Sequence, residues 1–310
     1  MLEKATGGES IRLWIEVAAN GLFGEGQITM IGPTDPNRYF NLKTCELVVF
    51  NDLAQSLYWD LEVLLGIAKE MPDTTQLSND ALYIANQIVN TIIVGKPETL
   101  HSAKTLAQSF FEARRRKGDF VPHNIIAIGN CHIDTAWLWP YDETKRKVAR
   151  SWSTQCRFLE QFPQYTFAAS QAQQFEWVEQ LYPQLFAKIQ GLVKQDKFIP
   201  IGGTWVEMDC NIPSGESFCR QFLYGQSYFK SKFGFYPKIF WLPDTFGYSS
   251  QLPQIIKLAK LEYFFTQKLS WYKEYWALTF VKEQHQQIST HLFLLEGFGW
   301  YFSPNPLFAC

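Results

Sequence analysis

The hydrophobic positions follow a short, strand-like pattern first and a helical pattern afterwards. Up to about residue 45 the apolar segments are short, with a Gly-rich turn at 21–27 and a turn signal at 32–37. From residue 51 to 71 leucines recur every four positions, at 53, 57, 61 and 65. This spacing places them on one face of an amphipathic helix. Two more helices are predicted at 78–93, with Ser78 or Asn79 as its cap, and at 97–118.

After residue 121, strand-like segments alternate with helical ones. The predicted strands are 124–130, 165–170, 198–203, 238–242 and 263–267. Helical stretches lie between them, among them 142–162 and 171–193. This alternation is typical of an α/β fold with a parallel sheet, either a barrel or an open doubly wound sheet. In both forms, ligands bind at the carboxyl ends of the strands.

Polar side chains follow the predicted strands at the edge where ligands would bind. In chain order they are His132 and Asp134, Ser170 and Gln171, Asp209, Asp244, and Lys268. His132 and Asp134 are two positions apart in an extended segment, so they point to the same side. An imidazole nitrogen and a carboxylate oxygen are both zinc ligands, and a catalytic zinc site has three protein ligands and an open position. A buried, hydrogen-bonded His–Asp pair explains the same spacing without a metal.

Two further aspartates have a structural and a functional interpretation each. Asp209 follows the Gly202-Gly203 pair and is the natural third ligand, but it could equally be a loop aspartate or a cap for a helix near Ser214. Asp244 could cap a helix after its Pro-Asp-Thr turn or support the site. The two tryptophans that follow the His–Asp pair, Trp137 and Trp139, could form the floor of a sugar site or pack in a core.

Composition narrows the class of protein. Of 310 residues, 46% are hydrophobic and 19% charged, and the net charge is −2, so we expect a globular protein without a nucleic-acid or acidic-membrane partner. The 11 tryptophans suit carbohydrate binding as well as a large aromatic core. The six cysteines are scattered without a CxxC pair, and neither a signal segment nor a membrane span is predicted. We therefore expect a cytoplasmic protein.

Five sequence strings together resemble one enzyme family. They are GNCHIDTAWLWP, SQAQQFEWV, GGTWVEMDCNIPSGES, FWLPDTFGYSSQLPQI and TQKLSW. In this order and spacing they are similar to the cytosolic branch of the glycoside hydrolase family 38 α-mannosidases, and the similarity runs from about residue 12 to 271. The resemblance implies a (β/α)-barrel-like catalytic domain and a retaining, zinc-dependent hydrolase. The implied substrates are mannose-containing oligosaccharides, cleaved at terminal non-reducing α-D-mannose in free oligosaccharide catabolism.

The resemblance also implies roles for individual residues. His132 and Asp134 match two zinc ligands, and Asp209 matches the carboxylate that both binds the metal and attacks the anomeric carbon. Trp137 matches the aromatic residue under the mannose ring. The implied metal is Zn²⁺, or Co²⁺ in its place. The resemblance leaves open whether the full-length protein is a homo-oligomer.

The sequence after Trp271 departs from the family pattern. The family continues there into a strand, an aspartate that acts as the acid/base and a histidine that is the fourth zinc ligand. Here no aspartate follows Asp244, and His285 and His291 come too soon after the fifth predicted strand to supply the ligand. We therefore expect a partial chain that is inactive by itself. The expected regions are a remnant of an N-terminal β domain (1–45), a helical linker region (46–120), an incomplete (β/α)-barrel catalytic domain (121–271) and a divergent tail (272–310).

Two other functions fit the same residues. One is a metal-dependent deacetylase or amidohydrolase on a related barrel, in which Asp209 would be a ligand or base and not a nucleophile. The other is a folded remnant that binds sugar without turning it over, because the acid is missing. A covalent glycosyl adduct on Asp209 would argue against the first, and zinc stoichiometry together with mannose binding would separate the second from the hydrolase.

Overall fold

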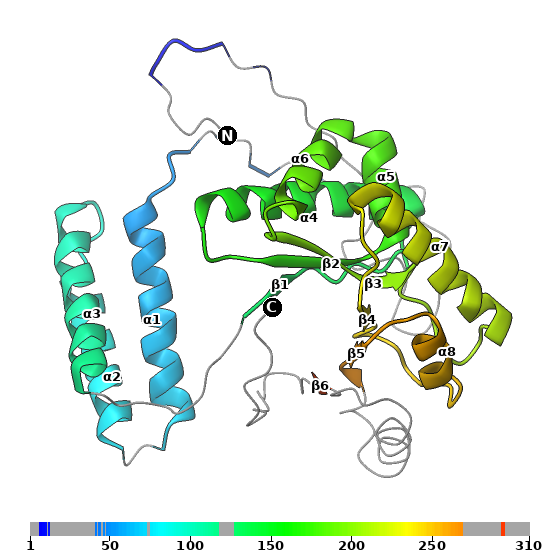
Figure 1. Ribbon diagram of the computed structural model, residues 1–310. Helices are drawn as coiled ribbons and strands as arrows, with labels where there is room; N and C mark the ends of the chain where they lie inside the picture. The colour runs from blue at the N-terminus through cyan, green and yellow to red at the C-terminus, as the bar shows by residue number, and fades with distance from the viewer. Residues whose placement is uncertain are drawn as a thin grey trace. The chain divides into compact units, whose positions relative to one another are not determined.

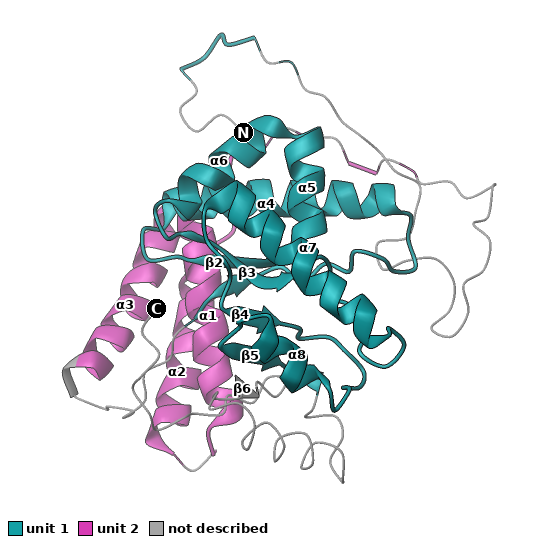
Figure 2. Cartoon of the chain, turned by 45° about the vertical axis from the view of Figure 1, so that its right-hand side comes forward, with its two compact units in different colours: residues 1–40, 125–310 teal, residues 41–124 magenta. Residues whose placement is uncertain are grey.

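The computed structural model describes residues 6–10, 12, 41, 43–44, 46, 48–72, 75–117 and 127–268, and the backbone of 293–294. The chain divides into two compact units, one of residues 41–124 and one of residues 1–40 and 125–310 (Figure 2). Most of the predicted β remnant and of the tail, including His285 and His291, lies outside the described residues. Within the described part, no helix is long and apolar enough to cross a membrane.

The smaller unit consists of three helices at the predicted places (Figure 1). They are α1 (Asp52–Glu70), α2 (Gln76–Thr91) and α3 (Glu98–Lys117). Their shared core includes Leu57 and Leu64 of α1. The expected every-fourth leucine face is wrong at its last position, because Leu65 is exposed and Leu64 is buried instead. A helix has 3.6 residues per turn, so a contact face that starts at Leu57 continues at i+7 and not at i+8.

The predicted cap of α2 is also wrong. Thr75 caps the helix, since its hydroxyl accepts a hydrogen bond from the backbone N–H of Ser78 at 3.2 Å. Ser78 is itself buried and donates its hydroxyl to the carbonyl of Ala68 at 3.1 Å. The helix therefore begins one turn earlier than predicted, because a Thr three residues before the first buried position satisfies the free N–H groups.

The larger unit is α/β, and its strands are parallel and alternate with helices as predicted. The strands are β1 (Gly129–Asn130), β2 (Phe167–Gln171), β3 (Phe198–Thr204), β4 (Ile239–Trp241), β5 (Tyr263–Thr266) and β6 (Phe293–Leu294). Hydrogen bonds join β1, β2 and β3 in one sheet and β4, β5 and β6 in another. The helices are α4 (Tyr141–Gln161), α5 (Ala172–Leu181), α6 (Pro183–Val193), α7 (Gly215–Phe233) and α8 (Leu252–Leu258).

The stretch 171–193, predicted as continuous helix, is two helices. Proline 183 begins α6, and the residue before it, Tyr182, has φ −135° and ψ 60°, which is not helical. A proline excludes the helical conformation from the residue that precedes it and lacks an N–H group to continue the bonding pattern. The chain therefore bends at this point, and both α5 and α6 bury one face in the same core.

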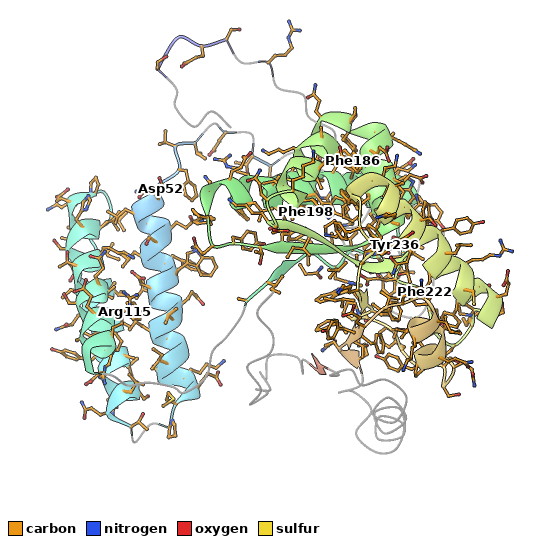
Figure 3. The ribbon with its side chains drawn as sticks, in the orientation of Figure 1. Asp52, Arg115, Phe186, Phe198, Phe222 and Tyr236 are labelled. Carbon is orange, nitrogen blue, oxygen red and sulfur yellow. The ribbon has the colours of Figure 1, made fainter. Side chains whose placement is uncertain are left out.

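Two aromatic cores hold the strands and helices of this unit together. The first lies between β2, β3 and helices α4 to α7 and includes Trp152. Figure 3 labels two more of its members, Phe186 and Phe198. The second joins β4 and β5 to α7 and α8, and includes Phe222 and Phe240, whose ring centroids are 5.0 Å apart. Helix α7 contributes to both cores and fixes the segment that follows β3.

Candidate metal site

The functional side chains follow the carboxyl ends of consecutive parallel strands. His132 and Asp134 come just after β1, Gln171 is the last residue of β2, Glu207 follows β3, and Asp244 follows β4. Because the parallel strands β1 to β3 end at the same edge of their sheet, residues far apart in the sequence meet there, and Asp244, after a strand of the second sheet, reaches the same group.

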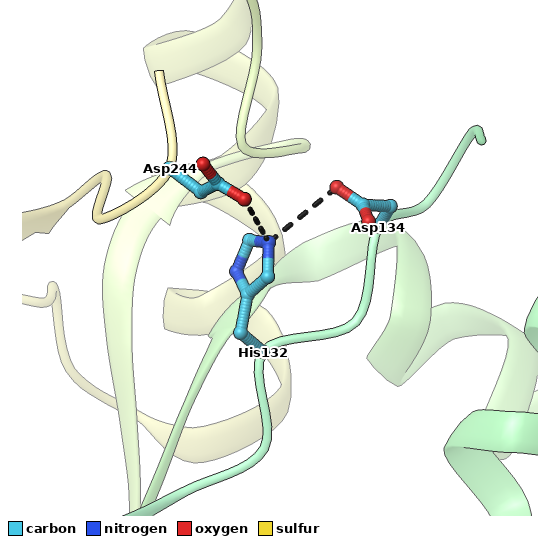
Figure 4. Close-up of side chains that lie close together, drawn as sticks. All are labelled: His132, Asp134 and Asp244. Carbon is cyan, nitrogen blue, oxygen red and sulfur yellow. Dashed lines mark ion pairs between the residues drawn. The ribbon is translucent and has the colours of Figure 1, made fainter. Parts of the chain in front are cut away.

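His132 and two aspartates form a compact group (Figure 4). The Nε2 atom of His132 lies 3.4 Å from Oδ1 of Asp134 and 3.4 Å from Oδ2 of Asp244. One ligand atom from each of the three residues lies within 4.8 Å of the others. The side chains of His132, Asp134 and Asp244 are 28%, 34% and 30% exposed, so a small ion can reach them from solvent although most of each side chain is covered by protein.

Two of the three ligand-to-ligand distances in this group have the spacing of ligands on a small metal ion. Two ligand atoms that each lie about 2.1 Å from a tetrahedral ion are roughly 3.4 Å apart. The two distances from His132 Nε2 have this value. One nitrogen and two carboxylate oxygens are also a zinc donor set, and three protein ligands leave a fourth position open.

Carboxylates dominate the electrostatics around His132. Its Nδ1 atom lies 2.9 Å from Oε2 of Glu207, whose side chain is only 7% exposed. Burial lowers the pKa of His132, but the hydrogen-bonded carboxylates of Asp134 and Glu207 outweigh burial and raise the pKa to about 10. Asp244 has a second charged partner, since Lys268 lies 3.0 Å from its other oxygen. The cluster thus favours a positive charge at the position of the ring.

A hydrogen-bond network holds the loop that carries His132 and Asp134. The buried Gln171 side chain donates to the carbonyl of Ile133 at 2.8 Å and accepts from the hydroxyl of Thr135 at 2.6 Å. Gln174 of α5 donates to the same carbonyl at 2.7 Å. Thr144 of α4 donates to the carbonyl of Thr135 at 2.9 Å. The loop is therefore held at Ile133, the residue between the two candidate ligands, and at Thr135, the residue after Asp134.

The register of β2 and β3 shifts next to the site. Ala169 pairs with Pro200, whereas Gln171 pairs with Thr204, so β3 has extra residues between these points. Gly202 has φ +95° there, and a Cβ atom on it would collide with the backbone of Ser170. Only glycine fits this conformation and this close approach. Gly202 therefore lets β3 approach the end of β2 closely beside the site.

A pocket of about 530 Å³ opens beside the candidate metal site. Its lining includes His132, Asp134, Trp137 and Trp139, together with Lys147 of α4. The Trp137 side chain is 53% exposed, whereas Trp139 is held by a hydrogen bond from its Nε1 to Thr144 and by the Lys147 ammonium 4.5 Å from its ring centroid. Of the two tryptophans, Trp137 is thus the one free to contact a ligand.

Comparisons with known proteins assign this chain to a family. Residues 122–294, more than half of the chain, match the model of the glycosyl hydrolases family 38 N-terminal domain. The chain belongs to glycosyl hydrolase family 38. Residues 1–48 match a second model, the alpha-mannosidase jelly roll domain.

Several named relatives match over most of the chain. "Alpha-mannosidase 2C1" of Mus musculus is 51% identical over 268 residues, which are 86% of this chain and 26% of that protein. "Alpha-mannosidase" of Saccharomyces cerevisiae is 44% identical over 281 residues, 87% of this chain and 26% of that protein. A solved alpha-mannosidase from Enterococcus faecalis matches with 25% identity and TM-score 0.42, covering 45% of this chain and 16% of that one. The chain thus spans about a quarter of the length of the curated relatives.

Asp209 lies apart from the three-residue group in this family 38 chain. It is exposed, and its Oδ1 accepts hydrogen bonds from the backbone N–H groups of Asn211 at 2.7 Å and Ile212 at 2.9 Å. It does not cap the next helix, because Ser214 caps α7. Asp244 likewise caps no helix, since its oxygens face His132 and Lys268. The structure therefore decides against capping for both aspartates.

Sequence reasoning missed Glu207, the most buried carboxylate of the site. Glu207 and Asp209 are two positions apart, and an extended segment places both on one side. This two-residue spacing was a signal in the sequence that Glu207 is also a candidate for the site. It was missed because only the carboxylate at the end of the segment matched the family motif.

Proposed function

We propose that this chain carries the metal-binding part of the active site of a retaining, zinc-dependent α-mannosidase. The substrates would be oligosaccharides with terminal non-reducing α-D-mannose. The observation that carries the proposal is the pair of 3.4 Å distances from His132 Nε2 to Asp134 and Asp244, which fit a tetrahedral zinc site in a family 38 chain. The printed names of the relatives, alpha-mannosidases in mouse and yeast, support the choice of sugar.

His132, Asp134 and Asp244 would hold the ion. When bound, Zn²⁺ supplies a Lewis acid that can bind two hydroxyls of the sugar and favour a distorted ring. Trp137, half exposed beside the group, would contact the apolar face of the mannose ring. The network around Ile133 would keep the two ligands of this loop in place without rearrangement.

Asp209 would act as the nucleophile and as a further ligand. One of its oxygens would form a bond to the anomeric carbon while the glycosidic C–O bond breaks and the leaving oxygen takes a proton from the family's acid/base aspartate, which would have to come from outside this chain. The two N–H groups that bond to Oδ1 support this role, because they orient the carboxylate. Hydrolysis of the glycosyl ester by water would then complete a retaining reaction.

We also propose that the strands form the first part of a (β/α)-barrel. Support comes from their sequential order, β1-β2-β3 and β4-β5-β6, and from the parallel direction of every described pair. Residues 1–45 would be part of a β domain and 46–120 a helical linker. A cytoplasmic role in free oligosaccharide catabolism follows from the resemblance to the cytosolic branch of the family.

Hydrolysis of an aryl α-mannoside with Zn²⁺, by this chain and by a longer protein that contains it, tests the proposal. We expect little or no turnover by this chain alone, which has no counterpart of the family's acid, and in the longer protein a loss of roughly a thousandfold or more in Asp209→Asn. Asp196→Asn is the matched control, because Asp196 is exposed before the first residue of β3, at the opposite end of that strand. Mannose released with the α configuration, followed by proton NMR, would support retention. Zinc binding without turnover in the longer protein would contradict the proposal.

A further inference from the structure

His132 has a different partner on each ring nitrogen. Its Nε2 faces Asp134 and Asp244, each at 3.4 Å, whereas its Nδ1 lies 2.9 Å from Oε2 of Glu207. Glu207 thus contacts the side of the ring that faces away from the candidate metal. With 7% of its side chain exposed, it is too buried to reach a sugar bound in the open pocket.

Glu207 is itself held by the end of β2. The hydroxyl of Ser170 donates to its Oε1, and its backbone N–H donates to Oε1 of Gln171 at 3.1 Å. Gln171 is 2% exposed, and its Nε2 donates to the carbonyl of Ile133 at 2.8 Å. One buried amide therefore connects the backbone of Glu207 with the backbone between His132 and Asp134.

We propose that Glu207 is a positioning residue for the metal site. It accepts the hydrogen bond of His132 Nδ1–H, which fixes the rotation of the ring and leaves the Nε2 lone pair directed at the ion. The inference rests on the metal site of the proposed function and adds a residue to it. An imidazole can offer either nitrogen, and the nitrogen that binds the metal is set by the hydrogen bond that the other one makes.

The arrangement explains why a buried carboxylate is tolerated here. Oε1 accepts a hydrogen bond from Ser170, whereas Oε2 has no hydrogen bond of regular geometry and lies 2.9 Å from Nδ1 of His132, so its charge is offset by the imidazole as an ion pair. Gln171 bonds to both segments at once, so a displacement of the ring would require breaking bonds on two strand ends. The ring is therefore oriented before a metal arrives.

Binding of Co²⁺ to the purified 310-residue chain tests the proposal, since the visible absorption of Co²⁺ reports both affinity and coordination. We expect Glu207→Ala to weaken the affinity by about 10- to 100-fold. Glu207→Gln keeps an acceptor oxygen and should restore the affinity to within about fivefold of the wild type. Glu179, a carboxylate of α5 that pairs with Lys232 and Tyr228, is the matched control, and its Ala and Gln variants should stay within about twofold.

A spectroscopic measurement separates positioning from general stability. In long-range proton–nitrogen NMR spectra of the metal-free and Zn²⁺-bound chain, assigned with His132→Ala, the His132 ring should carry its proton on Nδ1 when the metal is bound. In Glu207→Ala the signals should broaden or split, because the ring is no longer held. The Glu179 variants should leave them unchanged.

Three results would overturn the proposal. The first is unchanged Co²⁺ affinity in Glu207→Ala, and the second is metal binding that persists in His132→Ala. If Glu207→Ala does not fold, Glu207→Asp withdraws the carboxylate by one methylene and should cost about tenfold in affinity, so unchanged affinity there is the third. If Co²⁺ binding responds as expected and a longer protein that contains this chain does not cleave aryl α-mannoside, the proposed function fails while the role of Glu207 stands.

Discussion

The α/β unit contains two charge clusters of opposite composition. In the first, the carboxylate of Glu143, 5% exposed, contacts three cations: Arg146 at 3.0 Å, Arg150 at 3.1 Å and Lys147 at 3.6 Å. In the second, around His132, one imidazole contacts three carboxylates. Each cluster has an excess of charge of one sign, but the exposure of that excess charge to water differs between the two.

Water solvates the excess charge of the Glu143 cluster, because the Arg150 side chain is 52% exposed. In the His132 cluster the carboxylates of Asp134 and Asp244, each about one-third exposed, converge on one atom, Nε2, while Glu207 faces Nδ1. Like charges that converge on one point are unfavourable unless a cation occupies it. The two clusters therefore differ in where the excess charge points, into solvent or toward one shared atom, and not in its amount. This direction distinguishes a candidate cation site from a structural ion-pair network.

The pKa shifts of Glu143 and His132 reflect the same difference between the two clusters. Burial raises the pKa of Glu143, but hydrogen bonds from Arg146 and Arg150 outweigh burial and hold the pKa below its ordinary value of 4.5. The pKa of His132 rises to about 10. Glu143 is already matched by the chain's own cations, whereas a proton on His132 takes a place that a metal ion would compete for.

The largest expected effect is stabilisation by zinc. Free Zn²⁺ at a thousand times its dissociation constant should add about 4 kcal/mol to the free energy of unfolding, because it binds only the folded chain. His132→Ala should abolish this increment, whereas Glu143→Gln should retain it. Urea unfolding followed by tryptophan fluorescence, with Zn²⁺ or a chelator, measures both. An equal zinc effect in His132→Ala would show that the ion binds elsewhere.

The next effect is the loss of the Glu143 charge. Glu143→Gln should lower the free energy of unfolding by about 2 kcal/mol with or without zinc, because it leaves buried cations without their anion. The cost is smaller than for a fully buried pair, since Arg150 is half exposed. In the metal-free chain, Asp134→Asn should cost less than about 1 kcal/mol, since it also relieves crowding of carboxylates.

Unfolding in acid tests whether the charge of Glu143 explains the cost of Glu143→Gln. The pKa of Glu143 is lowered in the folded chain, so its charge stabilises the fold above about pH 4.5, and this contribution is lost as the pH falls through the lowered value. The difference between the wild type and Glu143→Gln should therefore shrink in acid, as measured by urea unfolding at a series of pH values. A difference that stays constant would mean that packing, and not charge, explains the cost.

Sequence reasoning found the elements and half of the site. Alternating strands and helices, and the exits of those strands, were readable because hydrophobic periodicity is a local property. The pair His132 and Asp134 was readable for the same reason, since two positions in an extended segment share a side. The family motif named Asp209, and its role stays a prediction.

The rest depended on contacts between distant segments. Glu207 and Asp209 are two positions apart and would share one side of an extended segment. In the structure, however, Glu207 reaches His132 and Asp209 bonds to its own loop. That choice is set where β2 and β3 change register at Gly202, and no periodicity in the sequence encodes it. Local signals did exist for two errors, because Pro183 splits a helix and Thr75 is a better cap than a buried Ser78.

The smallest expected effect tests whether the excess positive charge is truly solvated. Arg150→Ala should cost about 0.5 kcal/mol, as expected for an exposed ion pair, whereas Arg146→Ala, at a side chain 23% exposed, should cost about 1 kcal/mol. At 1 M salt the Debye length is about 3 Å, so the cost of Arg150→Ala should fall below detection in urea unfolding. If Arg150→Ala costs as much as Arg146→Ala and resists salt, the positive charge converges on Glu143 as tightly as the carboxylates do on His132. Charge direction would then no longer separate the two clusters.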